Sequence, residues 1–301
     1  MIQNPLVSVI IPCYNNDNEQ FLRECFDSVV HQTYSPIQMI VIDDGSTNGA
    51  STLLEKLQKE YNFILEKQIN RGISGALNTG ITKHARGKYI AMLGSDDYWA
   101  SNKIELQVQF MESANDNVVA SCTRGYYIFE NDPSKPTPRL TRLLKPRELQ
   151  FENLLMRNCI MVISVMIRKD IFNELGLFDE NSAIEDWDMW LRITDKYEMG
   201  FVPEPLVYYR RHSNNMSNYF DKGYDSMKYI INKWKGRKGQ KQSLNQIELA
   251  GINNFARYRK AKALKIAITN VQCADRRLYW RGIFKTFLPG FIYRKKQNSS
   301  A

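Results

Sequence analysis

Short apolar segments alternate with amphipathic ones over residues 6–93, and this alternation limits the folds open to the chain more than any other feature. The apolar segments, rich in β-branched residues, are Leu6–Ile11, Gln38–Ile42, Phe63–Lys67 and Tyr89–Leu93. The segments with apolar residues at helical spacing are Gln20–Gln32, Ser51–Tyr61 and Ser74–His84. Strands that alternate with helices predict an α/β fold with a doubly wound, mostly parallel sheet flanked by helices.

The pattern is more mixed after Ser101. The elements expected there are a helix over Lys103–Ser113, a strand over Val118–Phe129, a Pro-rich loop over Asp132–Pro138 and an apolar strand over Cys159–Ile167. Helix-like spacing returns over Ser243–Val271, after a basic, glycine-containing linker at Lys233–Lys241.

Charge is distributed unevenly along the chain. Residues 1–221 hold 22 basic and 29 acidic side chains, and residues 222–301 hold 19 and 3, so the two parts carry net charges of −7 and +16. A protein that reads DNA would have a basic binding face in its main domain. The distribution instead favours a catalytic domain over residues 1–221 and a basic, helical C-terminal extension over residues 222–301, with no nucleic-acid partner.

The cysteines and the N-terminal segment indicate the compartment. The five cysteines are Cys13, Cys25, Cys122, Cys159 and Cys273. Their wide spacing and the lack of a C-x-x-C pair argue against disulfides and a cysteine zinc site. No basic segment precedes the first apolar run, and no run approaches the roughly 20 residues that cross a bilayer. These features favour a cytoplasmic protein.

Polar clusters follow three of the expected strands. They are Pro12-Cys13-Tyr14-Asn15, Asp43-Asp44-Gly45-Ser46 and Gly94-Ser95-Asp96-Asp97. Turn formation alone would explain any one of these clusters. Two acidic pairs at one sheet edge, however, repel each other unless a cation neutralises them, and oxygen ligands favour Mg²⁺ or Mn²⁺.

Two common nucleotide-binding motifs are missing from the sequence. No G-x-G-x-x-G follows the first strand and no G-x-x-x-x-G-K-[ST] occurs, which disfavours a Rossmann dehydrogenase and a P-loop ATPase or GTPase. Carboxylate-bound Mg²⁺ or Mn²⁺ keeps positions open for substrate phosphates. The pattern therefore suits a nucleotide-diphosphate donor.

Seven motifs together carry a family resemblance over residues 7–215. In order they are VSVIIPCYN, SVVHQTY, MIVIDDGSTNG, NRGISGALNTGI, GKYIAMLGSDDYW, EDWDMWLR and YYRRHSNN. The set closely resembles the inverting glycosyltransferases of family 2, which have the GT-A fold. The resemblance implies transfer of a sugar from a nucleotide diphosphate with inversion at the anomeric carbon, usually with Mn²⁺ or Mg²⁺.

The resemblance also assigns residues to the nucleotide of the donor. These are Pro12, Tyr14, Asn15, Asp43, Asp44, Arg71, Asn78, Ser95 and Asp96. Among them, Asp44 matches the carboxylate that hydrogen-bonds the base, and Asp43 is a weaker candidate for the same wall. Arg71 falls in the loop where the family approaches the base and ribose.

The metal motif departs from the family pattern. Asp96 and Asp97 match it, but Gly94 stands where the usual Asp-x-Asp form has its first aspartate, so a ribose contact is lost. Which aspartate binds the metal directly stays open. His212 is the third metal candidate, because its motif resembles one near the diphosphate; Arg210 and Arg211 are then either phosphate clamps or solvated charges.

Asp186 matches the catalytic base of the family. It follows Glu185 at the start of an expected helix in which Trp187 and Trp190 recur at helical spacing. Inversion requires a carboxylate that takes the acceptor proton opposite the leaving group. Glu185 and Asp188 are competitors for this role, and Glu185 and Trp187 are also candidates for contacts with the diphosphate or acceptor.

The basic tail has two interpretations. Residues 276–296 interleave cations with aromatic and aliphatic side chains, including Trp280, Phe284, Phe287, Leu288 and Phe291. One interpretation is a solvated helical appendage packed on the core. The other is docking at the anionic inner face of the cell membrane without crossing it.

The expected function is transfer of a sugar, with a UDP-sugar favoured, to a glycan or lipid-linked acceptor in the assembly of a bacterial-type surface polysaccharide or glycolipid. One alternative is a sugar nucleotidyltransferase, although the glycine-rich phosphate loop of that class is absent. The other is a basic module that binds membrane or nucleic acid without catalysis.

Overall fold

The computed structural model describes residues 4–129, 132–138, 146–212, 215, 220–256, 259–269 and 276–287. The chain divides into two compact units, Met1–Tyr219 and Phe220–Ala301. Each unit is described by itself below. Cys273, Leu288 and Phe291 lie outside the described residues, and the other four cysteines are free.

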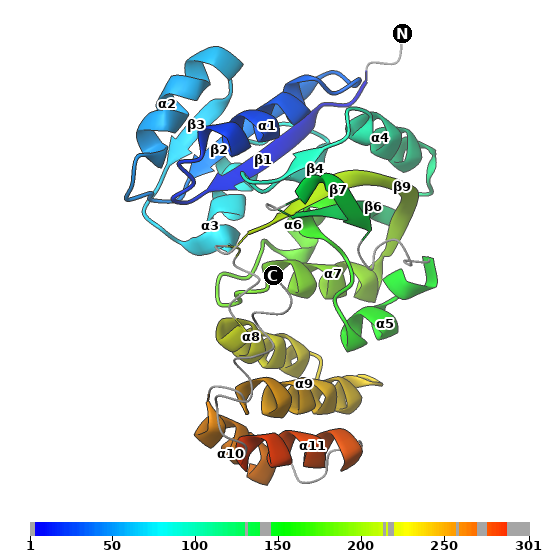
Figure 1. The fold of residues 1–301 in the computed structure, drawn as a ribbon. Helices are drawn as coiled ribbons and strands as arrows, with labels where there is room; N and C mark the ends of the chain where they lie inside the picture. Colours follow the sequence, from blue (N-terminus) through cyan, green and yellow to red (C-terminus); the bar gives the residue numbers. More distant parts are fainter. Residues whose placement is uncertain are drawn as a thin grey trace. The chain divides into compact units, whose positions relative to one another are not determined.

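A nine-stranded sheet forms the centre of the first unit (Figure 1). Its strands are β1 (Val7–Cys13), β2 (Ile37–Asp43), β3 (Ile64–Lys67), β4 (Tyr89–Met92), β5 (Tyr98–Trp99), β6 (Val118–Phe129), β7 (Asp132–Pro138), β8 (Met166–Arg168) and β9 (Glu198–Arg211). The order is β3-β2-β1-β4-β8-β6-β9-β5, with β7 paired to β6. The first four strands are parallel, β8 is antiparallel to β4 and β6, and β9 is parallel to β6. The expected α/β class is confirmed.

Helices connect the strands of this unit. They are α1 (Glu19–Val30), α2 (Ala50–Tyr61), α3 (Gly72–Thr79) with a π-helical continuation (Gly80–His84), α4 (Lys103–Ser113), α5 (Phe151–Met156), α6 (Ile171–Leu175) and α7 (Glu185–Lys196). Short 3₁₀ turns occupy Pro146–Leu149 and Val162–Ser164. Helix α1 begins where the Asn18 side chain accepts a hydrogen bond from the Phe21 amide, as is typical of an N-cap.

Side chains of β1 alternate between two covered faces of the sheet. Val9 and Ile11 belong to a buried cluster with Phe26 of α1 and Leu54 of α2. Ile10 points to the other face, where its Cγ2 would lie 2.6 Å from a Cβ placed on Gly80. Successive strand residues face opposite sides of a sheet. The parallel half of the sheet is therefore buried on both faces, which explains its continuous apolar runs.

Residues 132–138 correct one expectation, because they form strand β7 and not a loop. The strand pairs antiparallel with β6, with Tyr126 opposite Pro138 and Phe129 opposite Asp132. Proline lacks the amide proton that an inner strand needs on one side, but an edge strand tolerates it. Among the described pairings β7 contacts β6 alone, so its prolines fit an edge position.

The expected strand over Cys159–Ile167 is also corrected. Only its end is extended, in β8, and Val162–Ser164 forms a 3₁₀ turn. The Ser164 hydroxyl and amide both donate to the Met161 carbonyl, at 2.7 and 2.9 Å. Such local hydrogen bonds from serine compete with a strand ladder, and here they end the extended segment.

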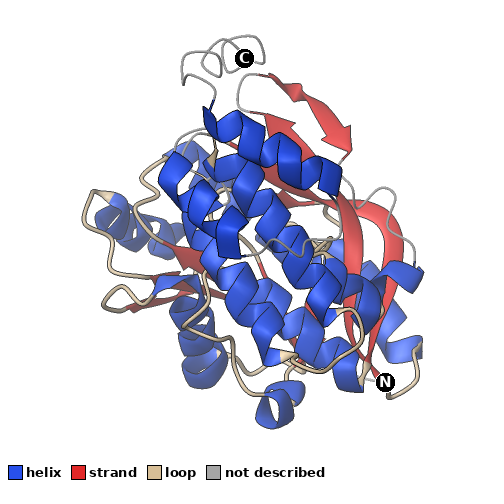
Figure 2. Ribbon diagram, turned by 90° about the horizontal axis from the view of Figure 1, so that it is seen from below, coloured by secondary structure: helices blue, strands red, loops and turns tan. Residues whose placement is uncertain are grey.

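The described part of the second unit contains helices and no strand (Figure 2). The helices are α8 (Phe220–Lys233), α9 (Gln240–Phe255), α10 (Lys260–Thr269) and α11 (Arg276–Phe287), and α9 contacts the other three. The helix-like spacing of residues 243–271 therefore belongs to two helices. Gly236 and Gly239 have φ of 91° and 89°, values that glycine adopts without strain, between α8 and α9. None of the described helices is both long and apolar enough to cross a membrane.

Candidate active site

Hydrogen bonds join the three polar segments that follow β1, β2 and β4. The Asn15 amide donates to Ser46 Oγ at 2.9 Å, which links the ends of β1 and β2. The Asn16 side chain donates to both the carbonyl and the hydroxyl of Ser95, each at 3.1 Å, which links β1 to β4. The predicted convergence of these segments at one sheet edge is thus present in the structure.

The two aspartates at the end of β2, Asp43 within the strand and Asp44 just after it, are buried and make different contacts. Asp43 accepts the Ser46 amide at 3.0 Å and so fixes the turn. Asp44 Oδ1 accepts the Gln68 side chain at 2.6 Å and the Arg71 amide at 2.9 Å. These two hydrogen bonds hold the Asp44 carboxylate in place. The family resemblance predicts that this carboxylate binds the nucleobase of the sugar donor.

Two other donor candidates lie at the end of β1. Pro12 is the last but one residue of the strand, and Tyr14 follows it with its side chain 52% exposed. The backbone of Asn15 has a φ of 53°, in the left-handed region that asparagine tolerates. This turn leaves the Tyr14 ring accessible to a ligand.

Arg71 and Asn78 meet at a residue that the sequence did not single out. Glu180 pairs with the Arg71 guanidinium, with the closest N···O distance at 2.5 Å. It also accepts a hydrogen bond from Nδ2 of the Asn78 side chain at 3.1 Å. Asn78 also exchanges two hydrogen bonds with the backbone of Phe178, each at 2.9 Å. The side chain of Asn78 thus fastens α3 to the loop that leads into α7.

The two aspartates of the acidic motif face different environments. Asp97 is buried and accepts the Arg210 amide at 2.7 Å; burial and the nearby charge of Asp96 raise its pKa. Asp96 keeps more of its side chain exposed, and its Oδ2 lies 2.7 Å from His212 Nε2. The fold brings Asp96 and His212 together from 116 positions apart, with Asn215 within 3.5 Å of the same oxygen.

Because Gly94 has no side chain, the carboxylates of Asp96 and Asp97 can lie close to its backbone. A Cβ at this position would lie 2.8 Å from Asp97 Oδ2 and 3.0 Å from Asp96 Oδ1. Both distances are shorter than ordinary contacts between carbon and oxygen. The absence of a side chain at this position is therefore matched to the observed placement of the two carboxylates.

Arg210 ties three elements together and is almost fully buried. Its guanidinium forms an ion pair with Glu24 of α1, donates to the Asp96 carbonyl at 2.8 Å and lies 4.1 Å from the ring centre of Phe21. Arg211 instead lies 5.5 Å from the ring centre of Tyr127. Glu24 gave no signal in the sequence, because nothing distinguishes it from other polar residues of an amphipathic helix.

The second polar centre is the start of α7. Asp186 Oδ1 accepts the Trp187 amide at 2.7 Å, and Oδ2 accepts the Asn158 side chain at 3.0 Å. Glu185 is buried; desolvation, followed by the negative charge of Asp186, raises its pKa to about 8. Burial therefore favours the protonated form of the Glu185 carboxyl at neutral pH.

The neighbours of this pair are committed to the scaffold. Trp187 is 4% exposed, and its indole nitrogen donates to the Leu154 carbonyl at 2.7 Å. Asp188 is fully buried and pairs with Arg192 at 2.9 Å. This ion pair makes Asp188 a poor competitor for the role of base, because a substrate hydroxyl would have to reach a buried, paired carboxylate.

Comparison with known proteins identifies the family. The model of Glycosyl transferase family 2 matches residues 8–176, more than half of the chain. The chain belongs to glycosyltransferase family 2. This assignment confirms the resemblance and decides against the nucleotidyltransferase and the non-catalytic module.

Two named relatives show what this glycosyltransferase resembles. The putative teichuronic acid biosynthesis glycosyltransferase TuaG of Bacillus subtilis is 29% identical over 78% of this chain and 85% of TuaG. The UDP-Glc:alpha-D-GlcNAc-diphosphoundecaprenol beta-1,3-glucosyltransferase WfgD of Escherichia coli is 29% identical over 62% of this chain and 69% of WfgD.

Solved structures confirm the GT-A fold. Staphylococcus aureus TarS 1-349 in complex with UDP-GlcNAc has a TM-score of 0.69 at 16% identity, covering 96% of this chain and 92% of TarS. The mannosyltransferase PcManGT of Pyrobaculum calidifontis, in complex with GDP-Man and Mn²⁺, has a TM-score of 0.59 at 16% identity, covering 95% of this chain and 85% of PcManGT.

The side chains near the acidic motif fit a divalent cation that takes some of its coordinating oxygens from the substrate. Across the described residues, no three His, Cys, Asp or Glu side chains gather to hold a metal. Asp96 and His212 supply one oxygen and one nitrogen at close range. Mg²⁺ and Mn²⁺ sites in nucleotide enzymes commonly use one or two protein ligands, with water and phosphate oxygens completing the shell.

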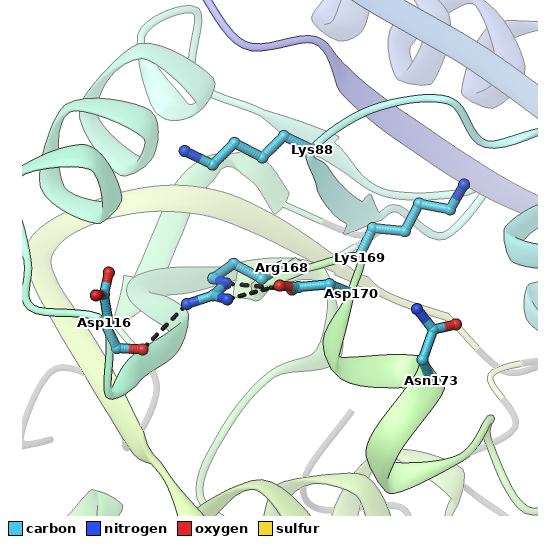
Figure 3. A pocket seen from close by; sticks show the side chains of 6 residues that line it. All are labelled: Lys88, Asp116, Arg168, Lys169, Asp170 and Asn173. Atoms are coloured by element: carbon cyan, nitrogen blue, oxygen red, sulfur yellow. Dashed lines mark hydrogen bonds and ion pairs between the residues drawn. The ribbon is translucent and has the colours of Figure 1, made fainter.

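A cavity of about 540 Å³ lies at the opposite end of β4 from this motif (Figure 3). It is lined by Lys88, Asp116, Arg168, Lys169, Asp170 and Asn173. Each cation already has a partner: Lys88 pairs with Glu112, Arg168 with Asp170, and Lys169 donates to the Ala85 carbonyl. The predicted donor and catalytic residues of the glycosyltransferase do not line this cavity.

Proposed function

We propose that this enzyme transfers a sugar, with inversion, from a nucleotide diphosphate to a hydroxyl of a glycan or lipid-linked acceptor. A UDP-sugar is the favoured donor. The observation that carries the proposal is the pairing of Asp96 with His212 at the same sheet edge as the Asp44 carboxylate. Family membership makes glycosyl transfer the reaction that this edge serves.

The nucleotide lies, in this proposal, between Tyr14 and Asp44. The base hydrogen-bonds the Asp44 carboxylate, which Gln68 and the Arg71 amide hold in place. Tyr14 offers an exposed ring for stacking. Arg71 is half-exposed, so its guanidinium is available to a ribose or phosphate once it leaves Glu180.

The diphosphate end uses Mn²⁺ or Mg²⁺, and Asp96 and His212 are the residues that would hold it. When bound there, such a cation would supply positive charge toward the departing nucleotide diphosphate. Asp97 braces the motif through the Arg210 amide, and Arg210 supports it through the Asp96 carbonyl. Two structures of related fold contain Mn²⁺, one with GDP-Man and the other with UDP and GalNAc, and they support a divalent ion.

Asp186 is the proposed general base. It takes the proton of the acceptor hydroxyl while that oxygen bonds to the anomeric carbon and the bond from this carbon to the diphosphate oxygen breaks. Asn158 orients the carboxylate through Oδ2. The pKa of the neighbouring Glu185 is raised by burial, so its protonated carboxyl does not compete for the acceptor proton.

The names of two relatives support the proposed acceptor and its location. TuaG is named for teichuronic acid biosynthesis and WfgD for a diphosphoundecaprenol-linked acceptor, so assembly of a surface polysaccharide is the favoured process. An acceptor of the second kind lies at a membrane. We place the enzyme in the cytoplasm, attached peripherally to the inner face of the cell membrane.

Thermal stability tests the donor and the metal together. UDP-Glc, UDP-GlcNAc and GDP-Man would each be added with Mn²⁺ or with EDTA; a donor at 100 times its Kd adds about 2.7 kcal/mol to the free energy of unfolding. We expect a UDP-sugar to raise Tm with Mn²⁺ only, and Asp96→Asn to remove the rise. Asp116→Asn, in the cavity of Figure 3, is the matched control. A rise that persists in EDTA would contradict the metal, and no rise with any donor would contradict the donor.

A further inference from the structure

Three large aromatic side chains stand exposed along one side of α11. The exposed fractions are 63% for Trp280, 67% for Phe284 and 73% for Phe287. Intervals of four and three residues place them on one face of the helix. We call this set the aromatic ridge.

The rest of α11 fixes which way the ridge points. Tyr279 is buried and its hydroxyl donates to the Ala267 carbonyl of α10 at 2.9 Å. A Cβ on Gly282 would lie 2.5 Å from Ile252 Cγ2 of α9, and Thr286 is buried. The inner face therefore packs closely on α9 and α10, and the ridge is the face left outside this packing.

Basic residues alternate with the ridge residues along α11. Arg281 is exposed directly beside Trp280, and Lys285 is half-buried beside Phe284, with its ammonium group donating to Asn253. On α10, Lys265 is exposed on the same helix as Ile268, a residue 66% exposed. Residues 222–301 carry 19 basic and 3 acidic side chains. The ridge is thus an apolar strip in a strongly basic part of the chain.

The combination of charge and apolar surface selects among occupants. A second copy of this chain would bring the same positive charge against itself, which opposes association. Single-stranded nucleic acid would satisfy the charge, but a strip of a tryptophan and two phenylalanines that needs burial matches an acyl-chain boundary better. An anionic lipid surface satisfies both demands, because headgroups meet the cations and the aromatic rings enter the interface.

We propose that the aromatic ridge docks this enzyme on an anionic phospholipid surface, with Arg281 facing the headgroups. The helix lies along the interface and does not cross it. This surface does not depend on the sugar-transfer chemistry, because all of its residues lie in the second unit.

Sedimentation with vesicles tests the proposal on the full-length chain. Vesicles of phosphatidylcholine alone would be compared with vesicles that contain phosphatidylglycerol, at low and high salt. We expect binding to the anionic vesicles only, weakened at high salt because the headgroup attraction is screened. Trp280→Ser/Phe284→Ser/Phe287→Ser should lower the partition coefficient about tenfold or more. The matched control, Phe129→Ser/Tyr229→Ser, removes exposed aromatic side chains from β6 and α8 and should bind as the wild type does.

Two further measurements guard against misfolding and against other occupants. Arg281→Glu keeps the three aromatic side chains and should weaken binding to anionic vesicles without changing the fold. We expect the tryptophan fluorescence of the wild type to shift to the blue when it binds vesicles, and Trp280→Phe should remove this shift. Equal binding by the ridge variant and the wild type would overturn the proposal. So would dimerisation, or binding of a single-stranded oligonucleotide, that the ridge variant loses while neither chain binds vesicles.

Discussion

Asp186 and Asp188 lie two residues apart on α7, yet the structure gives them different chemistry. Asp186 accepts hydrogen bonds from Asn158 and the Trp187 amide, whereas Asp188 is buried against Arg192. We expect Asp186→Asn to lower kcat by about 10²–10⁴ with the donor Kd unchanged, because the change removes basicity and keeps size.

Single-turnover rates and donor titrations would measure this effect. Asp188→Asn is the comparison, and it should lower Tm because it breaks a buried ion pair. If Asp186→Asn turns over within a few-fold of the wild type, the base lies elsewhere; if it loses donor binding, Asp186 belongs to the donor site.

Glu185 makes stability depend on pH. Its pKa is about 8 in the folded chain and near 4.5 when solvated, so the folded state holds a proton that the unfolded state releases between these values. The free energy of unfolding should therefore fall as pH rises from about 4.5 to about 8. Glu185→Gln mimics the protonated form, so its Tm should fall less than that of the wild type over this range. Parallel Tm–pH curves for the two proteins would contradict the assignment.

Asp44 is the residue-scale test of the donor wall. Removing one buried, charge-assisted hydrogen bond costs about 1.5–3 kcal/mol, so Asp44→Ala should weaken UDP binding roughly ten- to hundred-fold. Calorimetry with UDP alone measures this without the sugar. Asp116→Ala is the control, and unchanged UDP affinity in Asp44→Ala would leave Asp44 as a turn residue.

At the scale of elements, the ion pair between Glu24 and Arg210 joins α1 to β9 and the acidic turn. Glu24→Gln should lower the free energy of unfolding by about 1–2 kcal/mol, because Arg210 is buried while Glu24 is partly exposed. Glu19→Gln removes solvent-exposed ion pairs with Arg23 and Lys56, so it should lower the free energy of unfolding less than Glu24→Gln does. Urea unfolding of both variants and the wild type measures the difference. If Glu24→Gln unfolds at the same urea midpoint as the wild type, the ion pair between Glu24 and Arg210 contributes no stability.

The alternation of apolar and amphipathic segments predicted β1 to β4 and their helices within a few residues, because both faces of these strands are buried. It failed at β7, where prolines masked an edge strand, and at Val162–Ser164, where a serine bonds locally. Motifs singled out Asp96 and His212, which the structure brings together, and Asp186 at the start of α7. They missed Gln68, Asn158 and Glu180, whose roles arise from contacts between segments distant along the chain, which spacing does not encode.

At the scale of the whole molecule, the proposed donor site collects backbone from four separate stretches of the first unit. We expect UDP with Mn²⁺ to slow hydrogen exchange at residues 13–16, 44–48, 94–97 and 210–212, because ligand binding suppresses the local opening of these segments. The second half of α2 is the internal reference and should exchange unchanged. Protection around the cavity of Figure 3 instead would move the donor to that cavity.

Gly94 makes the effect of one substitution depend on whether another has occurred first. A Cβ there would meet the carboxylates of Asp97 and Asp96 at 2.8 and 3.0 Å, and Asp97 is held by the Arg210 amide. An aspartate at this position is therefore not tolerated as a single change, because Gly94→Asp places a third acid against two anchored ones. A lineage would first have to release Asp97, so the same substitution is harmful before that change and acceptable after it.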